Sequence, residues 1–295
     1  MRIVVTGASG LIGSALVQSL EADGHEVIHL VRRAPANDRE RRWDPNGQPD
    51  PEMVEGSDAV VHLAAETISG WWTEKKKSRI LNSRVRGTET IAAAIARAEK
   101  KPRVFLSASG AGYYGNRKDE VLTEQSTPGS GFLADLAKQW EAATKPASSA
   151  GVRVVLMRIS VVLSKNGGAL PQMLPSFKMG LGGKIGNGKQ YWPWITIDDV
   201  VRAIRFAMEN ESLNGPVNLC SPQQTTNKAF TKALGRVLGK PTFFPLPSVA
   251  VTLMLGEMGQ EALLSSGRVE PAKLKAAGFQ FQHPEIEQAL RSVLG

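Results

Sequence analysis

The stretch Thr6-Gly7-Ala8-Ser9-Gly10-Leu11-Ile12-Gly13 decides the fold that the sequence predicts. It follows the short apolar segment Ile3–Val5 and leads into Gly13–Ala22, where apolar residues recur on one helical face. Its glycines are spaced for a tight turn from strand to helix, at which free backbone N–H groups face an anion. The stretch therefore predicts a phosphate-binding loop, the alternative being a plain structural turn. The contacts to a dinucleotide expected in this loop are Gly7, Ser9, Gly10, Leu11, Ile12 and Gly13.

Segments rich in β-branched residues alternate with amphipathic segments through the first half of the chain. This alternation predicts parallel strands joined by crossover helices, because successive parallel strands need such a connection. We therefore expect an α/β fold, a Rossmann-type doubly wound parallel sheet with its ligand at the carboxyl ends of the strands. The expected strands are Arg2–Thr6, Glu26–Leu30, Ala59–Leu63, Arg103–Ser107 and Val152–Arg158, and the expected helices are Gly13–Ala22, Glu74–Lys100 and Leu133–Ala143.

The sequence changes in character after about Leu163. Glycine-rich segments and the aromatic segment Tyr191–Trp194 predict loops over a cleft that lies above the cofactor. Thr196–Val200 begins a further helix and Val217–Leu219 is typical of a short strand. We therefore expect residues 1–163 to form the nucleotide-binding domain, with residues 195–220 returning to it. Residues 164–194 and 221–295 are expected to form a smaller C-terminal, substrate-binding lobe.

Composition limits the classes of partner. The chain has 295 residues, a net charge of +8 and one cysteine, which cannot form an internal disulfide, so we expect a reducing, cytoplasmic location. Its histidines lack the spacing of a metal site, and no apolar segment is long enough to cross a membrane. Aromatic residues do not accompany the basic runs as they would in a single-strand binding surface. We therefore expect a small-molecule substrate and neither a nucleic acid, a membrane nor a metal; the oligomeric state is left open.

The residues after the second expected strand select the nucleotide. NAD-binding units place a carboxylate there to accept hydrogen bonds from the adenine ribose, but Leu30-Val31-Arg32-Arg33 contains none. Guanidinium groups pair well with a 2′-phosphate, so Arg32 and Arg33 predict NADP(H) rather than NAD(H). The alternative is a solvated pair of surface charges. Small residues after a later strand leave further room for the ligand, which adds Leu63, Ala64, Ala65 and Glu66 to the expected cofactor contacts.

Segments outside the glycine loop repeat the pattern of a known superfamily. They are His62–Ala65, Asn82–Thr88, Ser107–Ser109 with Tyr113–Gly115, Gly180–Gly186, Trp194–Val200, Thr226–Phe230 and Arg268–Pro271. On these motifs the chain resembles the extended short-chain dehydrogenase/reductase superfamily, and more closely its branch of nucleoside-diphosphate-sugar epimerases known as epimerase family proteins. The resemblance covers almost the whole chain. It implies an NADP(H) site, with Arg84 as a further cofactor contact.

The catalytic residues of that superfamily do not carry over. Its redox members use a helical tyrosine, a lysine four residues later and a nearby serine or threonine, and the resemblance places Leu133 and Ala137 at the first two positions. Lys138 is one position away, a rotation of about 100 degrees on a helix. Tyr114 and Lys118 have the right spacing but belong to a loop. The remaining candidates for proton transfer are Ser109, Tyr113 and Tyr114.

Two functions remain open. The first is an NADP(H)-dependent oxidoreductase or epimerase that acts on a hydroxyl- or carbonyl-bearing substrate, of which a nucleotide sugar is one candidate. The second is a non-catalytic NADP(H)-binding regulatory protein, in which the cofactor sets the position of residues 180–194. The aromatic segment beside the expected cleft favours the enzyme.

Overall fold

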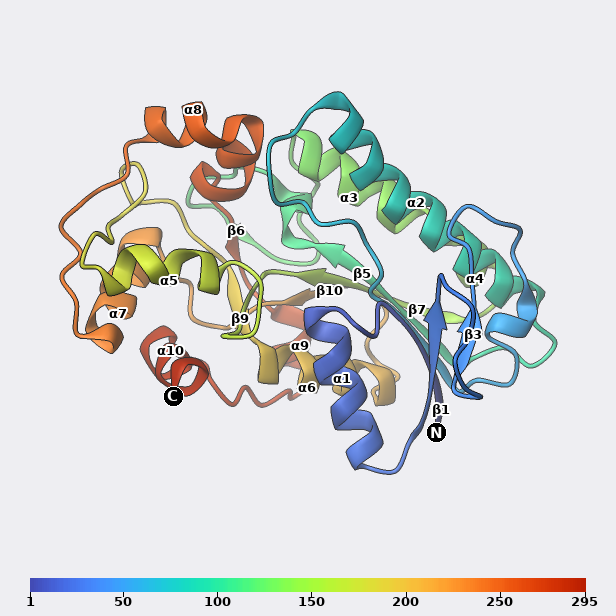
Figure 1. Cartoon of the computed structure of the whole chain (residues 1–295). Coiled ribbons are helices and arrows are strands. Elements are labelled where there is room, and N and C mark those ends of the chain that lie inside the picture. The colour runs from blue at the N-terminus through green and yellow to red at the C-terminus, as the bar shows by residue number, and fades with distance from the viewer.

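A seven-stranded, entirely parallel sheet forms the centre of the computed structural model, which describes residues 1–295. The strand order is β10-β7-β5-β4-β1-β2-β3, and the strand sequence reverses direction at β1, beside which a doubly wound sheet binds its ligand (Figure 1). The predicted Rossmann-type fold is confirmed. The strands of this sheet are β1 (Arg2–Thr6), β2 (Glu26–Val31), β3 (Glu40–Arg42), β4 (Ala59–His62), β5 (Val104–Gly110), β7 (Arg153–Ile159) and β10 (Gly215–Leu219).

Helices cover both faces of the sheet (Figure 1). One face packs against α1 (Leu11–Ala22) and α6 (Ile197–Glu209), and the other against α2 (Glu74–Arg97), α3 (Phe132–Ala142) and α4 (Lys145–Ser149). Successive strand residues alternate between the two cores, as the pleat of a strand requires. In β1, for example, Ile3 and Val5 belong to the first core and Val4 to the second.

The expected elements are all present, with ends that shift by up to three residues. The edge strand β3 was not expected, because its sequence Glu40-Arg41-Arg42 is charged throughout and lacks alternation. Charged residues suit an exposed sheet edge, which they protect from pairing with other chains. The last sheet strand, β10, lies beside β7, so the chain returns to the sheet after residue 194.

The C-terminal part of the chain forms its own apolar core. Trp192, Trp194, Phe230 and Leu290 are all buried in it. The prediction of an aromatic loop over the cleft was therefore wrong for the two tryptophans, because Trp194 begins strand β9 and both indoles fill this core. The main helices here are α5 (Leu170–Lys178), α7 (Asn227–Leu238), α8 (Ser248–Gly259) and α10 (Ile286–Leu294), with a π-helix at Gln260–Leu264.

Short elements join the two parts. Two small parallel sheets pair β8 with β9 and β6 with β11, and each pair connects segments distant in the sequence. None of the helices combines the length and apolarity needed to cross a bilayer. The remaining elements are β6 (Val121–Leu122), β8 (Val161–Leu163), β9 (Trp194–Thr196), β11 (Arg268–Val269), α9 (Ala272–Ala276) and the 3-10 helices Pro51–Met53 and Ala111–Tyr114.

A carboxylate from the C-terminal part holds the start of α3. Glu261 accepts hydrogen bonds from the backbone N–H groups of Phe132 and Leu133, at 2.7 and 2.8 Å. A side chain on Gly131 would collide with this carboxylate, so only glycine allows the approach. A second ion pair, between Lys77 on α2 and Glu257 on α8, lies close by. Both contacts fix the C-terminal part against the helices that flank the carboxyl edge of the sheet.

Candidate nucleotide-binding site

The glycine loop is as tight as the sequence predicts. Gly7 has a φ of +70°, and a Cβ on Gly13 would lie 2.1 Å from the Gly7 carbonyl oxygen. Because no side chain fits there, α1 can begin directly against the end of β1. The loop thus brings the N-terminus of α1 to the centre of the sheet edge.

Backbone N–H groups at that N-terminus are free to bind an anion. The helix is capped by Gly10, which offers no side-chain oxygen, and the N–H groups of Leu11, Ile12 and Gly13 donate to no group of the protein. Such unpaired donors, together with the positive end of the helix dipole, are the usual binding site of a phosphate group. On the outer side, Leu11 contacts Gly167 and Gly168 of the C-terminal part.

Thr6 joins the end of β1 to the end of β4. Its hydroxyl lies 2.7 Å from Nδ1 of His62 and accepts hydrogen bonds from the N–H groups of Leu63 and Ala64, both at 3.1 Å. Burial lowers the pKa of His62 to about 4, so the imidazole is neutral at physiological pH. These contacts hold the backbone of Leu63 and Ala64 beside Gly7, where a Cβ would already be too close to Ala64. Gly7, Leu63 and Ala64, three of the predicted contact residues, therefore lie side by side at the carboxyl ends of β1 and β4.

The two arginines after β2 have different environments. Arg33 donates two hydrogen bonds to the carboxylate of Glu40, at 2.5 and 2.7 Å, and one to the carbonyl of Ala34. Arg32 forms no hydrogen bond or ion pair with the protein and is exposed. The segment Leu30–Arg33 itself contains no carboxylate, but β3 places Glu40 beside β2. Arg33 neutralises Glu40, so Arg32 is the guanidinium available to a 2′-phosphate.

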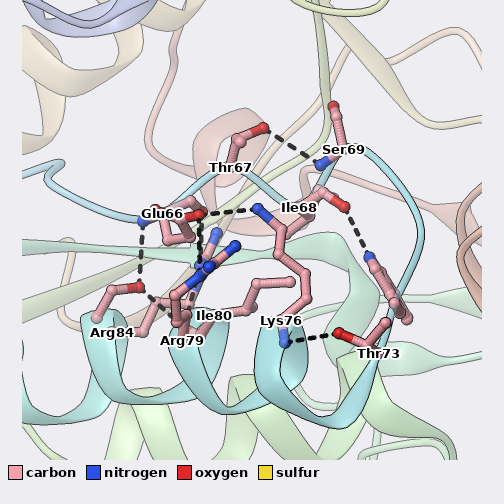
Figure 2. Close-up of polar contacts among 11 residues, drawn as sticks. Glu66, Thr67, Ile68, Ser69, Thr73, Lys76, Arg79, Ile80 and Arg84 are labelled. Atoms are coloured by element: carbon pink, nitrogen blue, oxygen red, sulfur yellow. Dashed lines mark hydrogen bonds and ion pairs between the residues drawn. The ribbon is translucent and has the colours of Figure 1, made fainter.

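Glu66, after β4, is surrounded by basic residues of α2 (Figure 2). Its carboxylate is 2.8 Å from Nζ of Lys76 and 3.7 Å from Nε of Arg79, and the hydrogen bond from Lys76 lowers the pKa of Glu66. Arg84 is buried, lies over the ring of Trp140, and donates to the carbonyls of Glu66 and Ile80. Burial lowers the pKa of Arg84 to about 10, which leaves it charged. These contacts fix the loop that follows β4.

A buried polar network lies at the ends of β5 and β7. Glu141 of α3 accepts a hydrogen bond from the Ser109 hydroxyl at 2.8 Å and two from Arg158, at 2.8 and 2.9 Å. Arg158 also donates to the Tyr114 hydroxyl at 3.0 Å, and that hydroxyl donates to Asn218 at 2.7 Å. Burial alone would lower the pKa of Arg158, but the hydrogen bonds and charge of Glu141 raise it. The ion pair is fully hydrogen-bonded, as a buried pair must be to persist.

The three candidates for proton transfer differ in burial and in their hydrogen bonds to this network. Tyr114 is completely buried, and its burial raises its pKa to about 12, so it is poorly suited to exchange protons with a substrate. Ser109 is also buried and its proton is directed to Glu141. Tyr113 is half-buried, its ring lies 3.4 Å from the Arg158 guanidinium carbon, and its hydroxyl forms no hydrogen bond. Tyr113 is therefore the candidate with a free hydroxyl.

Leu133, in the first turn of α3, stands where the resemblance places the superfamily's tyrosine, and it packs against Gly112 in the turn that carries Tyr113. The sequence reasoning missed Glu141, Arg158 and Glu261. A signal existed for Arg158, because a charged residue interrupts an otherwise apolar strand. The described chain has no group of three or more His, Cys, Asp or Glu side chains placed to hold a metal ion.

Comparison with known proteins adds the following similarities. Residues 3–220 match the family described as NAD dependent epimerase/dehydratase, and residues 246–293 match a domain of unknown function, DUF1731. The chain is 47% identical over 290 residues to the epimerase family protein Mb2239 of Mycobacterium bovis, covering 98% of this chain and 96% of that protein.

Two solved structures are informative. The crystal structure of the human epimerase family protein SDR39U1 with NADPH has a TM-score of 0.91 at 35% identity and covers 99% of both chains. The structure of UDP-glucose 4-epimerase from Thermotoga maritima with UDP-glucose has a TM-score of 0.76 at 21% identity, over 100% of this chain and 97% of that one. The second likeness shows the fold alone.

The burial of Tyr114 predicts a late ionisation. In an ultraviolet titration, one of the three tyrosines should ionise near pH 12, and Tyr114→Phe should remove that step. The folded chain keeps this proton up to about pH 12, whereas the unfolded chain loses it near pH 10.0. The free energy of unfolding should therefore fall as the pH rises between these values, and less so in Tyr114→Phe. If Tyr114→Phe lost an ionisation step at lower pH and kept the step near pH 12, the burial of this phenol would be contradicted.

Proposed function

Because the chain belongs to the NAD dependent epimerase/dehydratase family, we propose that it is an NADP(H)-dependent enzyme that oxidises, reduces or epimerises a hydroxyl- or carbonyl-bearing substrate. A nucleotide sugar is one candidate substrate. The observation that carries the proposal is the cradle formed by Gly7, Gly13 and the free N–H groups of α1. We further propose that residues 1–163 and 195–220 form the nucleotide-binding domain and the remainder the substrate lobe.

The cofactor fits the residues that are present. The free N–H groups of Leu11, Ile12 and Gly13 would hold the pyrophosphate, and a side chain on Gly13 would leave no room for the loop itself. Arg32 would pair with the 2′-phosphate, which agrees with the NADPH found in the human relative. Leu63 and Ala64, fixed by Thr6, would form the wall beside the cofactor.

When bound, the nicotinamide supplies a hydride acceptor or donor. The chain must then supply the proton transfer that accompanies hydride transfer at a hydroxyl or carbonyl carbon. Tyr113 can do this through its free hydroxyl. Arg158 stacks on its ring and Leu133 packs beside its turn, so the phenol is held in one place although no lysine adjoins it.

The second candidate function is a non-catalytic NADP(H)-binding regulatory protein. It is favoured by one specific observation, the apolar residues Leu133 and Ala137 at the positions of the usual tyrosine and lysine. Under this alternative the cofactor site would have a structural or signalling role only. Turnover of a substrate would identify the enzyme, and its absence would favour the regulatory protein.

The unequal environments of the two arginines predict the cofactor preference. Arg32→Ala should weaken NADPH binding by about 10-fold to 100-fold, because it removes a charge-assisted contact to the 2′-phosphate, and should leave NADH binding unchanged. Arg33→Ala should have a smaller effect, since Glu40 already occupies that guanidinium. Titration calorimetry with both nucleotides, and the corresponding shifts in Tm, would measure this. Equal losses for NADPH and NADH in Arg32→Ala would refute the assignment.

The catalytic proposal predicts turnover that depends on Tyr113. The purified chain with NADPH or NADP+ should convert at least one member of a panel of carbonyl compounds and nucleotide sugars. Tyr113→Phe should lower kcat by about 100-fold or more without changing the Kd for NADPH. An unchanged Kd for NADPH in Tyr113→Phe serves as the control, because it shows that the variant is folded and keeps its cofactor site. Absence of turnover across the panel would favour the regulatory function, and normal kcat in Tyr113→Phe would exclude Tyr113 as the proton donor.

A further inference from the structure

Most of the large apolar side chains that the molecule exposes lie on its C-terminal part. Met179 is 67% exposed and Phe243 82%, and on α8 Val249 is 68% and Leu253 74% exposed. A scattered exposed leucine needs no explanation, but a contiguous group of this kind marks an interaction site. We call this group the apolar rim; it comprises Met179, Leu181, Phe243, Phe244 and the outer face of α8 with Val249, Leu253 and Met254.

The segments of the rim are neighbours in space. The N–H of Phe244 donates to the carbonyl of Gly182, and the N–H of Leu246 donates to the carbonyl of Lys184 at 2.9 Å, so the loop before α8 lies along the loop after α5. Figure 1 shows the orange segment between α7 and α8 at the outer edge of the molecule, continuing directly into α8. The rim is therefore one surface rather than isolated residues.

The sequence of α8, Ser248-Val249-Ala250-Val251-Thr252-Leu253-Met254-Leu255, is apolar on every side, which is typical of a helix buried all round. Only its inner side is covered, since Val251 is fully buried while Val249, Leu253 and Met254 face outward. An apolar helix with one exposed side indicates that a binding partner covers that side.

Basic residues predominate around the rim, and the one carboxylate of α8, Glu257, is paired with Lys77. Residues 164–194 and 221–256 contain eight lysines and arginines and no aspartate or glutamate. Of these, Lys178 precedes Met179, Lys184 lies beside Leu246, and Lys240 lies three residues before Phe243. None of the three forms an ion pair, whereas many basic residues of the sheet domain do. The rim is thus an apolar surface flanked by unneutralised lysines.

We propose that the apolar rim binds the surface of an anionic phospholipid bilayer. The exposed side chains of α8 and Phe243 would enter the interface, and the lysines would pair with the anionic headgroups. The expectation that no membrane is a partner rested on the lack of a crossing segment, which a surface contact does not need. The proposal is independent of the catalytic function.

The charge and the apolar centre of the rim distinguish a bilayer from a second copy of the chain and from a nucleic acid. A second copy joined about a two-fold axis would bring like-charged lysines together, and the carboxylate of α8, Glu257, is already paired with Lys77. A nucleic acid would leave the apolar centre of the rim uncovered. An acidic protein would satisfy the charge, and the experiment below separates it from a bilayer.

The test is flotation of the full chain with vesicles of phosphatidylcholine alone or mixed with phosphatidylglycerol. We expect binding to the mixed vesicles only, weakened by salt. Replacing Lys178, Lys184 and Lys240 by Gln should lower the partition coefficient on the order of 100-fold, because each lysine near an anionic surface contributes about a five-fold gain. Leu253→Ser combined with Phe243→Ser should abolish binding at any salt concentration.

The matched control replaces Lys100, Lys101 and Lys145 by Gln, which removes the same charge from an exposed region away from the rim. This variant should bind as the unaltered chain does. Circular dichroism of every variant checks the fold, which substitutions of exposed residues should leave intact. Failure to bind mixed vesicles, equal binding with and without phosphatidylglycerol, or equal loss in the control would overturn the proposal. So would self-association in sedimentation that the Leu253→Ser variant abolishes, which would assign the rim to a second copy.

Discussion

The close contact between Gly13 and Gly7 is the constraint on which the rest of the structure depends. With 2.1 Å between the position of a Cβ on Gly13 and the Gly7 carbonyl oxygen, the chain can turn from β1 into α1 only with glycine at this place. The turn sets unpaired N–H groups at the sheet edge, and Thr6 ties the neighbouring end of β4 to the same point. This geometry places the free N–H groups of α1 and the ends of β1 and β4 together, where a dinucleotide can bind.

The region at the ends of β5 and β7 is built differently from that of the redox enzymes which the chain resembles. Their tyrosine and lysine stand on one helix, whereas here that helix contributes Leu133 for packing and Glu141 for a buried ion pair. Arg158, held by Glu141, contacts both tyrosines of the adjoining turn and buries one of them. Removing either member of the ion pair would leave a buried charge unpaired, at a cost of about 3 to 5 kcal/mol. The network therefore stabilises this region and leaves Tyr113, rather than Tyr114, with a free hydroxyl.

The sequence predicted the elements that depend on local pattern. The glycine loop, the alternating apolar strands and the first turn of α6 all carry signals within a few residues, and each was found. The charged edge strand β3 was missed, because its pairing partner and not its own sequence makes it a strand. The partnership of Arg33 with Glu40 and the buried network of Arg158 were missed for the same reason, since they join residues that only the folded sheet brings together. Tryptophans of the segment 191–194 were misplaced because a glycine-rich context predicts loops even where indoles fill a core.

If NADP(H) binds between Arg32 and Tyr113, a crystal structure of the chain with NADP+ will show it. We expect the pyrophosphate to contact the N–H groups of Leu11 and Ile12, and the 2′-phosphate to contact Arg32 rather than Arg33. We also expect the hydroxyl of Tyr113 to be the side-chain hydroxyl nearest the nicotinamide ring. A 2′-phosphate bound away from Arg32, or a nicotinamide ring with Tyr113 turned away from it, would contradict the account.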